Sequence, residues 1–159
     1  MMGNRIFCRS DGWYSKISAA VLVSVLLLAS CSHDDDENEF MAPGQNCLSC
    51  HGSGGNAAHE ATFTIAGTVF AALDSDTSAG VEGVSILLVD AADKQLTLKS
   101  NRVGNFFTSE SVQFPLKSVT VAKEGKEHFM DTQVSTGACS SCHTQPASGG
   151  APGRLYLTQ

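Results

Sequence analysis

Basic side chains are scarce in this sequence. Its 159 residues include 10 Lys and Arg against 16 Asp and Glu, which gives a formal net charge of −6. A surface of this sign repels a phosphate backbone, so the balance argues against a nucleic acid partner. An acidic surface mainly keeps a protein soluble, and it can also favour the approach of basic partner proteins.

The sequence also lacks the signatures of a helical domain and of the common catalytic centres. No segment between Phe63 and Lys123 keeps an apolar period of 3.6 residues over the length that a helix needs. No Ser/His/Asp set and no pair of carboxylates has a reason to converge. We therefore expect a mainly β core and a role other than that of an enzyme.

No apolar run is long enough for a comfortable membrane span. The run Ile17–Leu28 follows Arg5, Arg9 and Lys16 and ends in small residues. This arrangement is typical of an export signal, which we place at residues 1–30. The alternative is a signal anchor that is not cleaved.

Cys31 follows this signal directly. The segment Leu28-Ala29-Ser30-Cys31 resembles the lipobox of bacterial lipoproteins. The resemblance implies that Cys31 is acylated and becomes the first residue of an extracytoplasmic, lipid-anchored protein. Ser32 in place of aspartate resembles the sorting pattern for the outer membrane, on its periplasmic face or at the cell surface. Residues 31–45 are then a lipidated tether, acidic and too polar to bury anything.

The pentapeptide Cys-x-x-Cys-His occurs twice, and the two copies flank the central part of the chain. Two thiols at this spacing can form thioethers with the two vinyl groups of one haem, and the adjacent imidazole then reaches its iron. The pentapeptides resemble those of c-type cytochromes. The resemblance implies two c-type haems, with attachment at Cys47, Cys50, Cys139 and Cys142 and proximal iron ligands at His51 and His143. Cys8 leaves with the signal, so no thiol remains for a disulfide.

A zinc site is the main alternative for these cysteines, because four thiolates satisfy tetrahedral Zn²⁺. Such a site would not require a histidine after each second cysteine, and the long insertion between the pairs would be unusual. A dithiol oxidoreductase is a weaker alternative, because its motif belongs near a βαβ pattern that this sequence does not show. Plain disulfides are weaker as well.

Three side chains are candidates for the distal iron ligands. His59 stands eight residues after His51 on a glycine-rich loop, whose backbone can approach a porphyrin closely. His128 and Met130 precede the second pentapeptide. A histidine would lower the reduction potential and a methionine would raise it. For each candidate the alternative is an ordinary surface or core position.

Between the pentapeptides, short apolar runs alternate with turn residues, as is typical of β-strands. We predict strands at 63–73, 84–90, 96–100, 106–108 and 118–123, with a last edge strand at 154–157. The segments 65–69, 80–88, 104–106 and 119–125, in this order, resemble the carboxypeptidase regulatory-like, transthyretin-like family. This resemblance implies a small Ig-like β-sandwich over residues 63–127 with a structural or adhesive role.

The predicted protein is thus mainly β, with a sandwich that separates two loop-rich haem-binding segments, residues 46–62 and 128–159. Its predicted function is electron transfer by a membrane-anchored dihaem cytochrome to redox partner proteins or an extracellular electron acceptor. One alternative is a homo-oligomeric, filament-forming cytochrome subunit. The others are a peroxidase-like haem enzyme and an adhesive domain with a zinc knuckle.

Overall fold

The computed structural model describes residues 40–157. The predicted signal at residues 1–30, the lipidation site Cys31 and most of the predicted tether lie outside the described residues. Within residues 40–157, no helix has both the length and the apolar character needed to cross a membrane.

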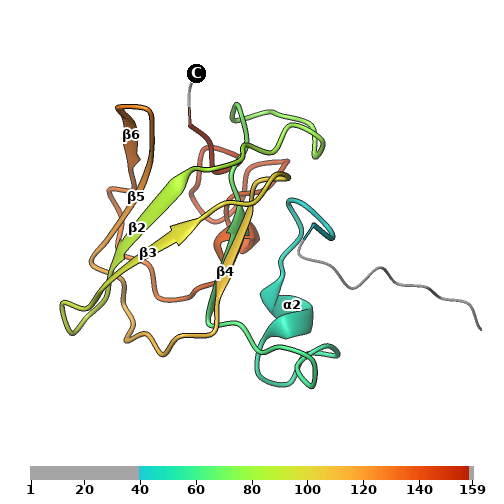
Figure 1. The fold of residues 1–159 in the computed structure, drawn as a ribbon, viewed down its shortest axis with the longest axis vertical. Coiled ribbons are helices and arrows are strands. Elements are labelled where there is room, and N and C mark those ends of the chain that lie inside the picture. The colour runs from blue at the N-terminus through green and yellow to red at the C-terminus, as the bar shows by residue number, and fades with distance from the viewer. Residues whose placement is uncertain (1–39, 158–159) are drawn as a thin grey trace, which may run out of the picture. The chain divides into compact units, whose positions relative to one another are not determined.

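The described chain is mainly β, as the sequence predicts, with two antiparallel sheets (Figure 1). One sheet pairs β1 with β4, and the other has the order β3-β2-β5-β6. The helical elements are short: α2 (Leu48–His51) and the 3₁₀ turn η1 (Cys139–Ser141). The strands are β1 (Ile65–Thr68), β2 (Ser85–Val89), β3 (Gln95–Lys99), β4 (Asn105–Thr108), β5 (Ser118–Lys123) and β6 (Lys126–Phe129).

The four-stranded sheet shows the alternation expected of strands with one buried face. Along β2, Ile86 and Leu88 are buried while Leu87 between them is exposed. Asp90 ends the strand, and its carboxylate accepts hydrogen bonds from the backbone N–H groups of Gln113, Ala92 and Lys94 at 2.8 to 3.0 Å. These bonds, the one from Gln113 above all, hold the pKa of Asp90 below its usual range.

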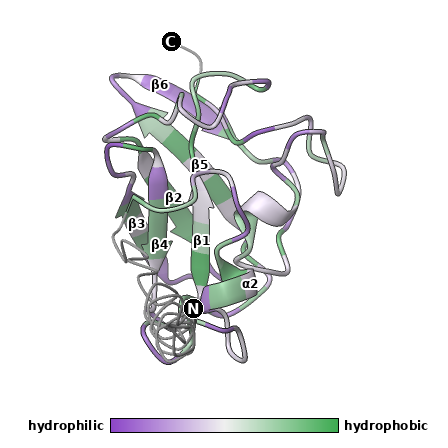
Figure 2. Ribbon diagram, turned by 90° about the vertical axis from the view of Figure 1, so that its right-hand side faces the viewer, coloured by the Kyte–Doolittle hydropathy of each residue, from purple (hydrophilic) through white to green (hydrophobic). Residues whose placement is uncertain are grey.

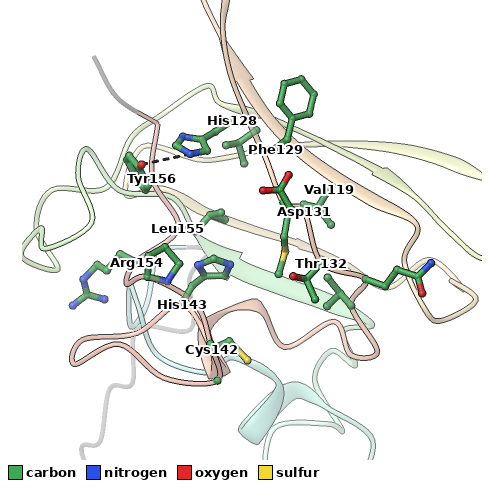
Figure 3. Close-up of a pocket in the computed structure, with 18 of the residues that line it drawn as sticks. Val119, His128, Phe129, Asp131, Thr132, Cys142, His143, Arg154, Leu155 and Tyr156 are labelled. Carbon is green, nitrogen blue, oxygen red and sulfur yellow. Dashed lines mark hydrogen bonds between the residues drawn. The ribbon is translucent and has the colours of Figure 1, made fainter.

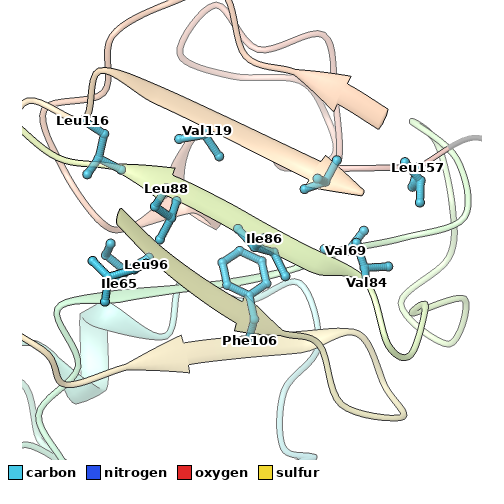
Figure 4. Packing of buried hydrophobic residues seen from close by; sticks show 11 residues of the cluster. Ile65, Val69, Val84, Ile86, Leu88, Leu96, Phe106, Leu116, Val119 and Leu157 are labelled. Carbon is cyan, nitrogen blue, oxygen red and sulfur yellow. The ribbon is translucent and has the colours of Figure 1, made fainter. Parts of the chain in front are cut away.

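One hydrophobic core joins residues from both sheets (Figure 4). Ile65 and Phe106 come from β1 and β4, while Ile86, Leu88 and Val121 come from the four-stranded sheet, and all five are at most 2% exposed. Figure 2 shows the resulting contrast in hydropathy, with hydrophobic colour along β2 and hydrophilic colour on β6.

The edge of β1 receives the C-terminal part of the chain. The Ala66 N–H donates to the Gly137 carbonyl at 2.9 Å, which places η1 against the strand in a parallel bridge. Beyond β1, Phe70 forms a second parallel bridge, with Tyr156. The edge strand predicted at 154–157 is therefore not formed as a strand, and this segment makes only the isolated bridge at Tyr156.

Sequence reasoning missed β6. This strand pairs antiparallel with β5, with Val121 opposite His128 and Thr120 opposite Phe129. Glu124 and Gly125 link the two strands with φ values of 52° and 78°, the left-handed conformation that matches the twist of a two-residue hairpin. The boundary predicted at residue 128 falls inside this hairpin, so His128 belongs to the sheet.

Candidate cofactor sites at the two Cys-x-x-Cys-His pentapeptides

The two pentapeptides, called box 1 (residues 47–51) and box 2 (residues 139–143), lie on different elements. Box 1 forms α2, none of whose residues is buried. Box 2 forms η1 and the two residues after it, and Cys139 packs against the hydrophobic core. Box 2 is therefore in contact with the core through Cys139, whereas α2 of box 1 contributes no buried residue.

Despite this difference, the boxes share one local hydrogen-bond scheme. In each, the histidine N–H donates to the carbonyl of the first cysteine, at 2.8 Å in box 1 and 3.0 Å in box 2. Each also has a serine before its second cysteine, and that hydroxyl donates to the carbonyl three residues earlier at 2.7 Å. In each, the thiol of the first cysteine approaches the carbonyl two residues earlier, at 3.7 and 3.6 Å. The two boxes are thus repeats of one conformation.

The histidine side chains complete this repeat. His51 Nδ1 lies 3.1 Å from the carbonyl oxygen of Ala61, and His143 Nδ1 lies 3.1 Å from that of Gly153, each ten residues downstream. Because a carbonyl oxygen only accepts, Nδ1 must carry the proton in both rings. In a neutral imidazole this leaves the lone pair on Nε2, which is the arrangement of a metal-binding histidine with a fixed ring.

In box 2, this Nε2 is buried and has no hydrogen-bond partner among the described residues. Burial lowers the pKa of His143, and the hydrogen bond to Gly153 opposes it only in part. The ring is therefore neutral at physiological pH, as metal binding requires. A buried lone pair without a partner is costly, so the atom is suited to an iron ligand in a cofactor site.

A cavity of about 590 Å³ adjoins this histidine (Figure 3). Its walls include Cys142 and His143 from box 2, together with His128 and Met130 from the end of the β5–β6 hairpin. The volume lies within the usual range of ligand and cofactor sites. Two of the three predicted distal ligands therefore share one cavity with the predicted proximal ligand of box 2.

The surroundings of box 1 are different. The His51 ring stacks on Phe63 at 4.7 Å between centroids, and Phe63 stacks on Phe107 at 4.6 Å. The Phe63 N–H also donates to the His51 carbonyl at 2.7 Å. His59 has a side chain that is 74% exposed and pairs with Glu60 at 3.2 Å. It stays a predicted distal ligand for this box, on a surface turn.

The thiols of the first cysteines are poor thiolates. Burial raises the pKa of Cys139 to about 12 and also raises that of Cys47. A dithiol oxidoreductase needs a lowered thiol pKa, so these two thiols do not fit that alternative. Within residues 40–157, no three His, Cys, Asp or Glu side chains are gathered as ligands of one metal ion. The described fold thus does not assemble the four-thiolate zinc site.

Box 2 lies against β1, where the Ala66 N–H donates to the Gly137 carbonyl and Ala66 forms a bridge with Ala138. The charge of a Cys47 thiolate contributes to the raised pKa of Cys139, so the first cysteines are within electrostatic reach. Figures 1 and 2 both place η1 near α2. Gly67 allows box 2 to approach β1 closely, because a Cβ at this position would meet Cys139 Cβ at 2.9 Å.

Sequence reasoning missed three contributors to these sites. They are the carbonyl groups of Ala61 and Gly153, and the side chain of Tyr156, which lines the cavity and contacts His128. The equal ten-residue spacing from each histidine becomes visible only in the structure, because no shared residue marks Ala61 and Gly153 in the sequence. Tyr156 gave no signal in the sequence either, because only the pairing with Phe70 brings it to the cavity.

Comparisons with protein-family models, with curated proteins and with solved structures gave no match to the chain. Function is therefore inferred from the residues of the two boxes.

Proposed function

We propose that the chain is a dihaem c-type cytochrome that transfers electrons. The observation that carries this proposal concerns His143: its buried Nε2 has no hydrogen-bond partner among the described residues, and the residue lines a cavity together with His128 and Met130. An iron coordinated on one side by an imidazole and on the other by a second imidazole or a thioether is a typical electron-transfer centre.

The roles of the residues follow from the repeated box geometry. Cys47 and Cys50 would hold one haem, and Cys139 and Cys142 the other, through thioether bonds that form when a reduced thiol adds across a vinyl group, the sulfur bonding to one carbon and a proton to the other. The Ala61 and Gly153 carbonyls fix the orientation of the two histidine rings. When bound, each haem supplies an iron that exchanges one electron between its ferrous and ferric states.

The two antiparallel sheets support the prediction of a transthyretin-like sandwich, which would set the distance between the two boxes. Its strands on both sides of the shared core would hold the boxes at a constant separation, and electron transfer depends steeply on that separation. With the predicted export signal and acylated Cys31, the protein would act outside the cytoplasm as an anchored relay between redox partner proteins, or to an extracellular acceptor.

The test is expression of the full chain with a cytochrome c maturation system, followed by intact mass and optical spectra. We expect two covalent haems per chain with low-spin, six-coordinate bands. Cys50→Ala and Cys142→Ala should each remove or weaken attachment at one box. Cys8→Ser is the matched control, since Cys8 lies in the predicted signal and its loss should leave the haem content at two.

Other outcomes would point to other functions. A chain that carries zinc and no covalent haem would refute the proposal. Rapid spectral change with peroxide or carbon monoxide would indicate an open iron position and an enzyme. Filaments seen by electron microscopy of native material would indicate a structural cytochrome subunit.

A further inference from the structure

His128 and Tyr156 form a side-chain pair in the wall of the box 2 cavity. The Tyr156 hydroxyl lies 3.4 Å from His128 Nε2, drawn as the dashed line in Figure 3, and the rings meet edge to face at 4.6 Å between centroids. The hydroxyl either donates to Nε2 and uses its lone pair, or accepts the proton that Nε2 carries. In both cases a metal would have to displace this contact in order to bind Nε2, the nitrogen farthest from the backbone.

The backbone holds Tyr156 in place. The Phe70 N–H donates to the Leu155 carbonyl at 2.8 Å, and the Leu157 N–H donates to the Phe70 carbonyl at 3.2 Å. These bonds flank Tyr156 on both sides and attach it to the chain just beyond β1. The hydroxyl is therefore presented to His128 by a fixed element rather than by a free loop.

Met130 lies on the same face of the hairpin as His128. Val121 stands opposite His128, and the Met130 N–H continues the ladder by donating to the Val119 carbonyl at 3.0 Å. Residues two apart on a strand share a face, so His128 and Met130 both point to the side of the buried valines, while Phe129 between them is 63% exposed. Met130 packs against the core and lines the cavity.

We propose that Tyr156 selects the distal ligand of box 2: by holding His128 through Nε2, it leaves Met130 to coordinate the iron. This inference rests on the proposed function, because it concerns the haem of that site. Tyr156 is a positioning residue that acts through His128. A thioether ligand raises the reduction potential and an imidazole lowers it, so the Tyr156 hydroxyl would keep this haem at the higher potential.

The test uses the full chain with haem attached, in wild type and in Tyr156→Phe, which keeps the ring contact and removes only the hydroxyl. The readouts are the methionine-to-iron charge-transfer band of the oxidised protein and the midpoint potential of the haem to which it belongs. Loss of that band in Met130→Leu assigns it to box 2. In Tyr156→Phe we expect the band to weaken or vanish and the potential of this haem to fall.

Two further variants separate ligand selection from a general structural effect. His128→Ala should keep the band and the potential of the wild type, since His128 is not the ligand. The double variant, Tyr156→Phe with His128→Ala, should recover both the band and the potential, because the competing imidazole is gone. A purely structural role of Tyr156 would instead leave the double variant as impaired as the single one, and would overturn the inference.

Two other results would also overturn it. If the wild type has no methionine band and His128→Ala changes the spectrum of box 2, then His128 is the ligand despite Tyr156. If Tyr156→Phe keeps the band and the potential, Tyr156 does not select the ligand. Both outcomes leave the proposed function intact, whereas a chain with no haem at Cys139 and Cys142 would refute the proposed function itself.

Discussion

Replacing Gly67 with alanine would test how box 2 is attached to the core. Gly67 lies on β1 opposite Phe106, and a Cβ added to it would stand 2.8 Å from the Phe106 ring and 2.9 Å from Cys139 Cβ. Both contacts are shorter than van der Waals separation, so the ring, the cysteine or both must move. Cys139 packs against the same core, which leaves little room for this movement.

The expected magnitude follows from two opposing effects. Overfilling a packed core costs about 1–3 kcal/mol. Against this, alanine restricts the unfolded chain and returns roughly 0.4–1 kcal/mol relative to glycine. We therefore expect Gly67→Ala to lower the free energy of unfolding by about 1–2 kcal/mol. A shift of Cys139 should also reduce haem attachment at box 2 and spare box 1, because the atoms nearest to the added methyl group belong to Phe106 and Cys139.

The assays are urea unfolding and haem-peptide mass analysis after proteolysis, which reports each box separately. Ser118→Thr is a matched control, because it adds one methyl group at an exposed position of β5 and should change stability by less than about 0.5 kcal/mol. A Gly67→Ala protein with unchanged stability and full attachment at both boxes would show that the contact of Cys139 with β1 does not position box 2.

Three other predictions follow from single residues. Phe106→Ala should lower the free energy of unfolding by about 3–5 kcal/mol, measured by urea titration, because the ring is 1% exposed in the core; a loss below about 1 kcal/mol would contradict this packing. Asp90 has a folded-state pKa below its unfolded value, so it stabilises the fold above about pH 4 and this contribution is lost as the pH falls through the folded pKa. Thermal melts over this pH range should show that Asp90→Asn is less stable than the wild type near neutral pH and loses less stability on acidification. Equal acid sensitivity of the two proteins would contradict this role of Asp90. Phe63→Leu removes the ring on which His51 stacks, a contact worth about 0.5–1.5 kcal/mol, and should change the paramagnetic resonance signal of the box 1 haem alone; an unchanged signal would show that the stack does not orient His51.

The β content could be read from the sequence because it depends on local patterns. Ile86–Val89 is a short apolar run followed by turn residues, so β2 was predicted to within one residue at each end. The strand predicted at 63–73 was too long, because only Ile65–Thr68 pairs as β1. The hairpin to β6 was missed because Lys126-Glu127-His128-Phe129 is polar at three of four positions, as an exposed edge strand is. Its only signal was the Glu124-Gly125 pair, a weak turn pattern.

The sequence by itself carries the prediction of what chemistry the sites support. The spacing of the cysteines and histidines in the two boxes is a covalent property of the chain, and it predicts haem attachment whatever the fold around it. The tertiary structure decided the rest: that Cys139 of box 2 packs against the core whereas no residue of α2 is buried, and that His128 and Met130 share a cavity with His143. It also decided that Tyr156 engages His128. These relations join residues far apart along the chain, and they arise from strand pairing and core packing, whose partners no local pattern specifies.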